Sequence, residues 1–173
     1  MGISNFEDKI VQKMTQKVLD SIYEPVFLNL SYGFRRGIGC HDAIKDLHQH
    51  LYKNKVQTII DLDIANYFGS IDRKLLEGML REKIKDEKFI RYIVRMFKAG
   101  VLAEGELQVS EKGVVQGSCS SSVLANVFAH YVIDEWIEQV VKPRCRGKMN
   151  LYRYCNDGVP RAQWRLQKAI TVN

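Results

Sequence analysis

The sequence predicts an α+β fold, with several helices and a small number of strands. Long stretches carry apolar residues at helical spacing, which is typical of amphipathic helices. Residues 58–60 are β-rich and apolar, and residues 149–155 alternate before an Asn-Asp turn, so both segments predict strands. The chain has 173 residues, which is enough for one domain with a hydrophobic core.

Composition and charge narrow the class of protein. Hydrophobic residues make up 46% of the chain and charged residues 27%, which is ordinary for a soluble globular protein. No apolar run approaches the roughly 20 residues of a membrane span, and the N-terminal segment lacks a signal-peptide pattern, so we expect a cytoplasmic protein. Basic residues outnumber acidic ones by 26 to 20, which favours a polyanionic partner such as a nucleic acid.

The cysteines and histidines follow no metal-site or disulfide pattern. The cysteines are scattered without a CxxC pair, at Cys40, Cys119, Cys145 and Cys155. This spacing predicts free thiols in a reducing compartment. The histidines have no metal-ligand spacing with these cysteines, so we expect no zinc site.

The N-terminal segment predicts a helix over residues 6–23. Asn5 can cap its beginning, and Pro25 ends it. Apolar residues at a spacing of four form the predicted core stripe, namely Ile10, Met14, Val18 and Ile22.

The following loop, over residues 29–39, combines aromatic and basic residues between glycines. Aromatic side chains in such a loop can stack on bases or fill a core, and we expect the core role for Tyr32 and Phe34. Arginine forks match phosphate oxygens, so we expect Arg35 and Arg36 to contact phosphates.

Three more helices are predicted in the first hundred residues. They cover residues 41–53, 72–84 and 86–99, and Asp72 is the expected N-cap of the second. The predicted core residues of the three are Ala43, Leu47, Leu51, Leu75, Leu76, Met79, Leu80, Ile84, Phe89, Ile90, Ile93, Val94 and Phe97. The basic residues between them fall on outer faces and are assigned no site.

The remaining elements are a hairpin, a glycine-bounded loop, a long helix and a strand. Residues 101–109 predict the hairpin, and the loop over residues 113–117 leads into a helix that extends to residue 140. The predicted core residues of that helix are Val123, Val127, Phe128, Tyr131 and Trp136.

Two carboxylates end the first predicted strand. Because strand side chains alternate between faces, Asp61 and Asp63 point the same way if the strand continues through them. A carboxylate at the end of a buried strand is costly unless it is hydrogen-bonded or holds a cation. Taken alone, this stretch also fits a solvated strand end followed by a capping turn.

Several short motifs follow one another along the chain in a characteristic order. They are SYGFRRG at residues 31–37 followed by Cys40-His41-Asp42-Ala43, then Asp63 with Phe68 at the fifth position after it, then Gln116-Gly117, and finally Tyr154-Cys155-Asn156-Asp157. This order resembles the reverse transcriptase family, and more narrowly the polymerases of group II introns and retron-like elements. In that family the first motif belongs to the fingers, a PQG loop stands at the place of Gln116-Gly117, and YADD stands at the place of residues 154–157.

The resemblance implies a right-hand polymerase with an antiparallel palm sheet and helices on one face of it. Fingers elements would occupy about residues 1–55 and the palm about residues 56–157, without a thumb. Residues 158–173 form an atypical tail, in which Pro160 is expected to break the strand early.

The resemblance also implies RNA-directed DNA synthesis with two Mg²⁺ ions, for which Mn²⁺ could substitute. Asp63 would bind both ions, the carbonyl of Ile64 and the carboxylate of Asp157 would be further ligands, and position 156 would normally be the second essential carboxylate. The implied partners are an RNA template, a DNA or RNA primer and a dNTP, with intron RNA as a possible further partner.

Other positions would contact nucleotide and template. Phe68 resembles the aromatic that blocks a ribose 2′-hydroxyl, although its residue type fits a core phenylalanine equally well. Gln116 and Gly117 resemble the loop that packs against the incoming nucleotide and the template base. Val115 and Ser122 replace prolines of the family, which predicts a less rigid loop.

Asn156 is the main departure from the family pattern. A neutral amide replaces one formal negative charge, so we expect activity to be lower by a factor on the order of 10³. Two alternatives therefore stay open: a non-catalytic RNA-binding protein in the manner of maturases, and a degenerate remnant.

Overall fold

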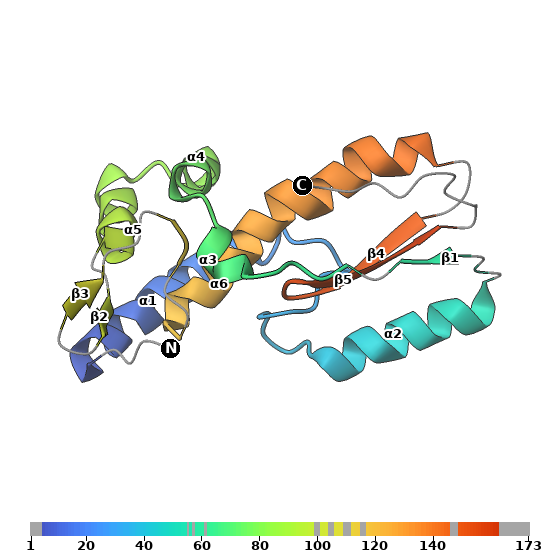
Figure 1. Cartoon of the computed structure of the whole chain (residues 1–173), viewed down its shortest axis with the longest axis horizontal. Helices are drawn as coiled ribbons and strands as arrows, with labels where there is room; N and C mark the ends of the chain where they lie inside the picture. Colours follow the sequence, from blue (N-terminus) through green and yellow to red (C-terminus); the bar gives the residue numbers. More distant parts are fainter. Residues whose placement is uncertain are drawn as a thin grey trace. The chain divides into compact units, whose positions relative to one another are not determined.

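The computed structural model describes residues 5–54, 56, 58–60, 62–98, 101–103, 106–108, 112–114, 117–145 and 149–162. For residues 101–103, 106–108 and 157–162 it describes the backbone only. The chain divides into two compact units (Figure 1). Unit 1 combines Met1–Leu28 with Ile64–Val132, and unit 2 combines Asn29–Asp63 with Ile133–Asn173.

Unit 1 is mainly helical. Its helices are α1 (Phe6–Tyr23), α3 (Tyr67–Ser70), α4 (Arg73–Lys83), α5 (Glu87–Lys98) and α6 (Cys119–Ala129). The predicted hairpin is confirmed as β2 (Val101–Ala103) paired antiparallel with β3 (Glu106–Gln108). Helix α1 packs against α6, and α4 packs against both α5 and α6.

Helix α1 begins as predicted but buries a different face. The side chain of Asn5 accepts a hydrogen bond from the backbone N–H of Asp8 at 2.8 Å, which is an N-cap. The buried residues are Thr15, Leu19 and Tyr23, whereas the predicted stripe is wrong because Ile10, Met14 and Val18 are 48%, 63% and 46% exposed. The buried face can include Thr15 and Tyr23 because their hydroxyls donate to backbone carbonyls, those of Val11 and Met79.

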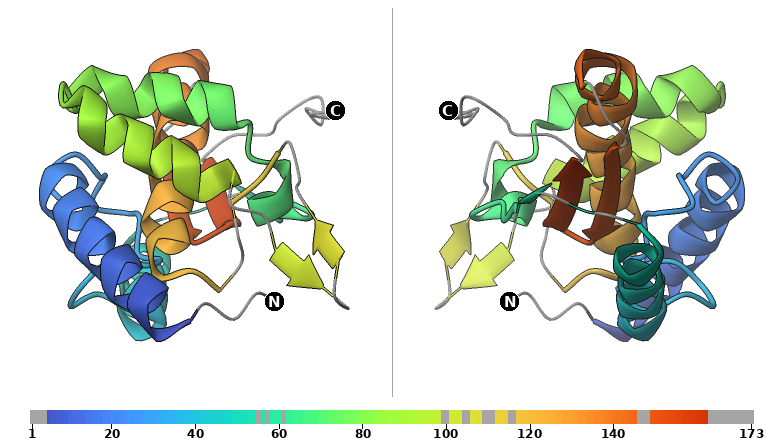
Figure 2. Two further views of the ribbon diagram at one scale, coloured as in Figure 1. Left: turned by 90° about the vertical axis from the view of Figure 1, so that its left-hand side faces the viewer. Right: turned by 90° about the vertical axis from the view of Figure 1, so that its right-hand side faces the viewer.

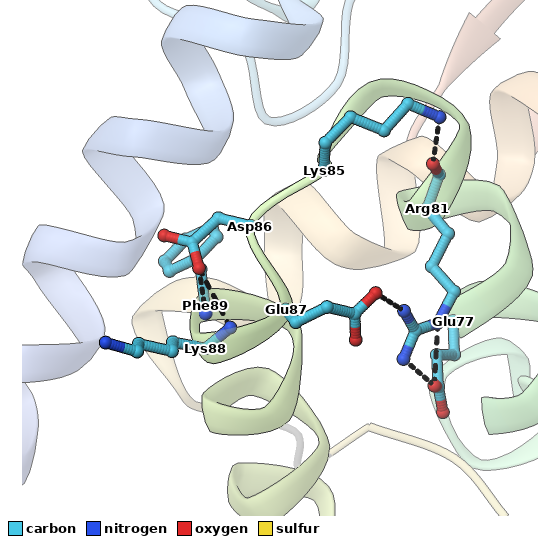
Figure 3. Close-up of polar contacts among 7 residues, drawn as sticks. All are labelled: Glu77, Arg81, Lys85, Asp86, Glu87, Lys88 and Phe89. Carbon is cyan, nitrogen blue, oxygen red and sulfur yellow. Dashed lines mark hydrogen bonds and ion pairs between the residues drawn. The ribbon is translucent and has the colours of Figure 1, made fainter.

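Helices α4 and α5 lie side by side (Figure 2). Leu76, Leu80 and Ile84 are buried, as are Ile90, Ile93 and Phe97, which confirms most of the predicted core of these helices. Leu75 is 58% exposed, so its predicted core role is wrong. The outer surface carries an ion pair of Arg81 with Glu77 and Glu87 (Figure 3).

The predicted N-cap of α4 is confirmed and supports a pH-dependent prediction. The carboxylate of Asp72 accepts hydrogen bonds from the N–H groups of Leu75 and Lys74, and the bond from Leu75 lowers its pKa most. A carboxylate with a lowered pKa in the folded state stabilises above its ordinary pKa, and that stability disappears as the pH falls through the folded value. Asp72→Ala should therefore lower the thermal midpoint at pH 7 by several degrees and have little effect near pH 2.

The control is Asp72→Asn, which keeps a cap but cannot titrate. Its thermal midpoint at pH 7 should fall less than that of Asp72→Ala and should depend less on pH than that of the parent. An equal loss for Asp72→Ala at both pH values would contradict the assigned role of the ionised carboxylate.

Helix α6 is buried on nearly all sides and continues into wider turns. Its buried residues include the polar side chains of Ser120, Ser121 and Asn126. The chain then forms π-helical turns over His130–Asp134 and Ile137–Val141 and a 3-10 turn over Lys142–Arg144. Each π turn adds residues to the helical repeat and rotates the inward face. This rotation explains why Trp136, a predicted core residue, is 40% exposed.

Unit 2 contains helix α2 (Cys40–Lys53) and a three-stranded sheet in the order β1-β5-β4. Its strands are β1 (Thr58–Ile59), β4 (Met149–Tyr154) and β5 (Asp157–Ala162), all paired antiparallel. Strands β4 and β5 lie side by side as a hairpin (Figure 2). Helix α2 packs against β4 but has no buried residue, so its predicted inward residues are at most half-buried.

The prediction that Pro160 breaks the last strand is wrong. Pro160 lies opposite Leu151 within β5, which continues to Ala162. Tyr154 and Asp157 flank a two-residue turn and so form a hydrogen-bonded pair. Hydrogen-bonded and non-hydrogen-bonded residue pairs alternate along an antiparallel ladder, so Leu151 and Pro160, three pairs further on, form a non-hydrogen-bonded pair. Proline therefore loses no bond to β4 at this position.

The loop before α2 places one predicted aromatic in the core and the other outside it. Tyr32 is buried, donates its hydroxyl to Asp46 at 2.9 Å and stacks on Tyr152 with ring centroids 6.5 Å apart, which confirms its predicted core role. Burial is the main cause that raises the pKa of Tyr32. Phe34 is 39% exposed and has a φ of 58°, so its predicted core role is wrong.

The cysteines are free, as predicted. Among the residues described by the structure, no helix has the length and apolar content needed to cross a membrane.

Candidate active site

Asp63 and Asn156 are 93 positions apart in the sequence and meet in unit 2. The side-chain amide of Asn156 donates a hydrogen bond from Nδ2 to Oδ1 of Asp63 at 3.2 Å. Asp63 is exposed and Asn156 is half-buried. The structure thus brings together two of the three residues that the sequence predicts to be catalytic.

A tight hairpin carries Asn156 to this position. Cys155 and Asn156 form the turn between β4 and β5, and Cys155 has a φ of 57°. Asp157, the third predicted catalytic residue, begins β5, and its backbone pairs with Tyr154. The side chain of Asp157 lies outside the described part of the structure.

Gly33 packs directly against this turn. A Cβ added to Gly33 would lie 2.2 Å from the backbone nitrogen of Cys155 and 2.7 Å from its Sγ. A side chain at position 33 would displace the backbone of the turn, which explains why a glycine stands here. The SYGFRRG segment is therefore in contact with the hairpin that carries Asn156.

A buried ion pair lies immediately behind the turn. Arg153 and Asp134 are each 1% exposed, and the guanidinium donates two hydrogen bonds of 2.7 Å to the carboxylate. Neither residue was assigned a role from the sequence. The available signal was Arg153, the one charged residue of the strand Met149–Tyr154, because a charged side chain is rarely buried unless it is paired. Asp134 stands next to Glu135 and gave no such signal.

The predicted nucleotide-contacting residue Phe68 lies on α3 in unit 1. Its side chain is half-buried, and its ring centroid is 5.9 Å from that of Tyr67. Tyr67 is buried and donates its hydroxyl to the carbonyl of Ala125 in α6 at 2.7 Å. Helix α3 is thus fixed to the core helix of unit 1, with Phe68 at the edge of that core.

The loop before α6 is fixed to α3 by backbone contacts. The N–H of Val114 donates to the carbonyl of Phe68, and that of Gly113 donates to the carbonyl of Ile71, both at 2.8 Å. Gly113 has a φ of 79°, and a Cβ there would lie 2.7 Å from the carbonyl oxygen of Phe68. Arg73 donates from Nε to the carbonyl of Gly113 at 2.7 Å, and burial lowers the pKa of Arg73.

The other residues predicted to contact nucleotide or template are divided between the two units. Gly117 is exposed with a φ of 103° directly before α6, and Gln116 lies outside the described residues. In unit 2, Arg35 is half-buried and donates from Nη1 to the carbonyl of Ser31 at 2.7 Å, whereas Arg36 is exposed. Ile64, the predicted backbone ligand, is half-buried. It follows Asp63 directly in the chain and is the first residue of the segment Ile64–Val132 of unit 1.

The charge of the Asp63–Asn156 pair limits its chemistry. Within the described residues there is no group of three or more His, Cys, Asp or Glu side chains that could hold a metal ion. The pair provides one carboxylate, and one of its oxygens already accepts a hydrogen bond from the amide. Oxygen ligands of this kind suit Mg²⁺, but more than one carboxylate normally contributes to such a site.

Comparison with known proteins agrees with the order of motifs. Residues 1–160 match the family described as reverse transcriptase (RNA-dependent DNA polymerase). The chain belongs to the reverse transcriptase family. Its relatives among intron-encoded proteins place it in the group II intron type.

Two relatives illustrate this similarity. The group II intron-encoded protein LtrA of Lactococcus lactis subsp. cremoris is 33% identical over 172 residues, which is 97% of this chain and 28% of LtrA. An uncharacterized 91 kDa protein in the cob intron of Schizosaccharomyces pombe is 38% identical over 140 residues, covering 81% of this chain and 17% of that protein.

A more distant relative carries the maturase name. Nuclear intron maturase 3, mitochondrial, of Arabidopsis thaliana is 27% identical to this chain over 130 residues. The match covers 73% of this chain and 17% of the maturase. The chain thus spans less than a third of the length of each of these three relatives.

Proposed function

We propose that this chain contributes the fingers and palm of an RNA-directed DNA polymerase from a group II intron-like mobile element. The contact between Asp63 and Asn156 at 3.2 Å carries this proposal, because it joins the first catalytic motif to the YADD-like turn. In this proposal the sheet β1-β5-β4 is part of the palm, which covers about residues 56–157, and fingers elements cover about residues 1–55. Residues 158–173 stay assigned to an atypical tail, although β5 extends into them.

The proposed cofactors are two Mg²⁺ ions, for which Mn²⁺ could substitute. Asp63 and Asp157 would hold them with side-chain carboxylates, and Ile64 with its backbone carbonyl. Such ions supply charge stabilisation for nucleotidyl transfer and activate the attacking 3′-hydroxyl. The exposure of Asp63 leaves its carboxylate open to solvent and ions, which supports this role.

Asn156 should make the polymerase weak. An amide cannot neutralise cation charge, and here it also occupies one oxygen of Asp63 as a hydrogen-bond donor. Both effects lower the affinity of the site for divalent cations, because ligand charge sets that affinity.

Further residues would contact the nucleic acid and the nucleotide. Phe68 would select against a ribose 2′-hydroxyl, and Gln116 and Gly117 would face the incoming dNTP and template base. Arg35 and Arg36 would contact phosphates, and the exposure of Arg36 supports that role more directly. The proposed nucleic-acid partners are an RNA template and a DNA or RNA primer.

A second candidate function is RNA binding without catalysis. The neutral Asn156 at the catalytic turn favours it, as does the net charge of +6. The partner would then be an intron RNA, as the name of the Arabidopsis relative suggests.

Two assays distinguish the polymerase from the binding-only function. Primer extension and RNA binding are each measured for the parent chain and for Asp63→Ala. A polymerase gives weak, template-dependent extension in Mg²⁺ or Mn²⁺ that Asp63→Ala abolishes, while both chains bind RNA equally well. RNA binding should weaken with salt, because released counterions drive it. If neither chain extends a primer and both bind RNA without Mg²⁺, the binding-only function is supported instead.

A further inference from the structure

The buried arginine behind the turn makes more contacts than its ion pair alone. Besides Asp134, the guanidinium of Arg153 donates from Nη2 to the hydroxyl of Ser31 at 2.6 Å. It also donates from Nη1 to the backbone carbonyl of Cys155 at 3.0 Å. One side chain therefore connects the helical segment at Asp134, the loop at Ser31 and the hairpin turn.

The backbone of the same loop is paired with β4. The N–H of Arg153 donates to the carbonyl of Leu30 at 2.9 Å, and the N–H of Tyr32 donates to the carbonyl of Arg153 at 2.8 Å. Ser31 and Arg153 thereby form a parallel bridge. Gly33 also packs on Cys155, so residues 30–33 contact the turn directly. The guanidinium of Arg153 bonds the same turn through the backbone carbonyl of Cys155.

We infer that Arg153 is a positioning residue, which fixes the hairpin turn through the Cys155 carbonyl and so sets the place of residue 156 beside Asp63. Asp134 and Ser31 orient the guanidinium for this contact. The inference deepens the proposed function, because position 156 matters for chemistry only if the site is a polymerase site. The position of the turn itself can be measured without any activity.

The geometry requires a guanidinium. Its planar fork bonds both carboxylate oxygens of Asp134 and still has N–H groups for Ser31 and Cys155. Lysine offers one compact ammonium, which cannot span these partners. Arg153→Lys therefore keeps the charge but should release the turn.

The thiol of Cys155 can report on the turn if the other cysteines are replaced by serine. Two variants are compared with this single-cysteine parent: Arg153→Lys, and Arg153→Met combined with Asp134→Leu, which removes both buried charges. Arg81→Lys is the matched control, because the same change is made at an exposed ion pair in unit 1 (Figure 3). Each chain is tested for cooperative unfolding and for the rate of reaction with a disulfide reagent.

We expect Cys155 to react at least about tenfold faster in both Arg153 variants, since the turn opens more often once its bonds are lost. The rate in Arg81→Lys should stay within about twofold of the parent. Unchanged reactivity in a folded Arg153 variant would overturn the inference. If neither Arg153 variant folds, Ser31→Ala decides: faster reaction supports the inference and an unchanged rate overturns it.

The catalytic readout uses the Asn156→Asp background. Adding Arg153→Lys to it should lower kcat for primer extension by about tenfold or more, without changing RNA affinity or the KM for dNTP. A rise in KM with unchanged kcat would overturn the positioning role. If Asn156→Asp has no activity, the proposed function fails, and the reactivity of Cys155 still decides the role of Arg153.

Discussion

Asn156→Asp is expected to raise the rate of RNA-templated primer extension in Mg²⁺ by about 10³-fold, the scale on which loss of a charge-stabilising group lowers kcat. The change replaces an amide that hydrogen-bonds Asp63 with a second carboxylate at the same place. Two carboxylates this close repel each other unless a cation lies between them. The variant therefore creates the charge that a divalent cation requires.

The control is the same substitution with Asp63→Ala, which should return the rate to background. Asn156→Ser is a second control, because it removes the hydrogen bond to Asp63 without adding charge. If Asn156→Ser gains as much activity as Asn156→Asp, release of Asp63 rather than added charge explains the gain. No gain in either variant would contradict the role proposed for position 156.

Arg153→Met is expected to lower the free energy of unfolding by about 3–5 kcal/mol, the cost of leaving one member of a buried ion pair unpaired. Asp134 would be left at 1% exposure without the two guanidinium bonds. Urea denaturation followed by circular dichroism measures this loss. Arg81→Met should have a much smaller effect, because its partners lie at the surface (Figure 3).

The double variant Arg153→Met/Asp134→Leu tests the cause. Removing both charges leaves no unpaired ion, so most of the lost stability should return. A double variant as unstable as Arg153→Met would show that lost packing or the bonds to Ser31 and Cys155, rather than the unpaired carboxylate, explain the effect.

Local signals in the sequence predicted the features that depend on few residues. Asn5 and Asp72 cap their helices as expected, because capping needs only a side chain and the next turn of backbone. The strand before the Asn-Asp turn was predicted by alternation, and it is β4. The proximity of Asp63 and Asn156 fits the family resemblance, because no local rule joins residues so far apart.

The features that were predicted wrongly from the sequence depend on distant partners. The inward face of α1 was misplaced because Thr15 and Tyr23 can be buried only where their hydroxyls find carbonyls. Pro160 was expected to end a strand, but the effect of a proline depends on the pairing register. Arg153 and Asp134 were not predicted as a pair, because two charges 19 positions apart show no contact in the sequence.

Divalent-cation binding would show whether Asp63 and position 156 together form a metal-binding polymerase site. Mn²⁺ affinity is measured by calorimetry for the parent chain, for Asn156→Asp and for Asn156→Asp/Asp63→Ala. We expect Mn²⁺ to bind at least about tenfold more tightly to Asn156→Asp than to the parent, because ligand charge sets affinity. The double variant should lose that gain. Equal affinity in all three chains would contradict a metal site formed by Asp63 and position 156.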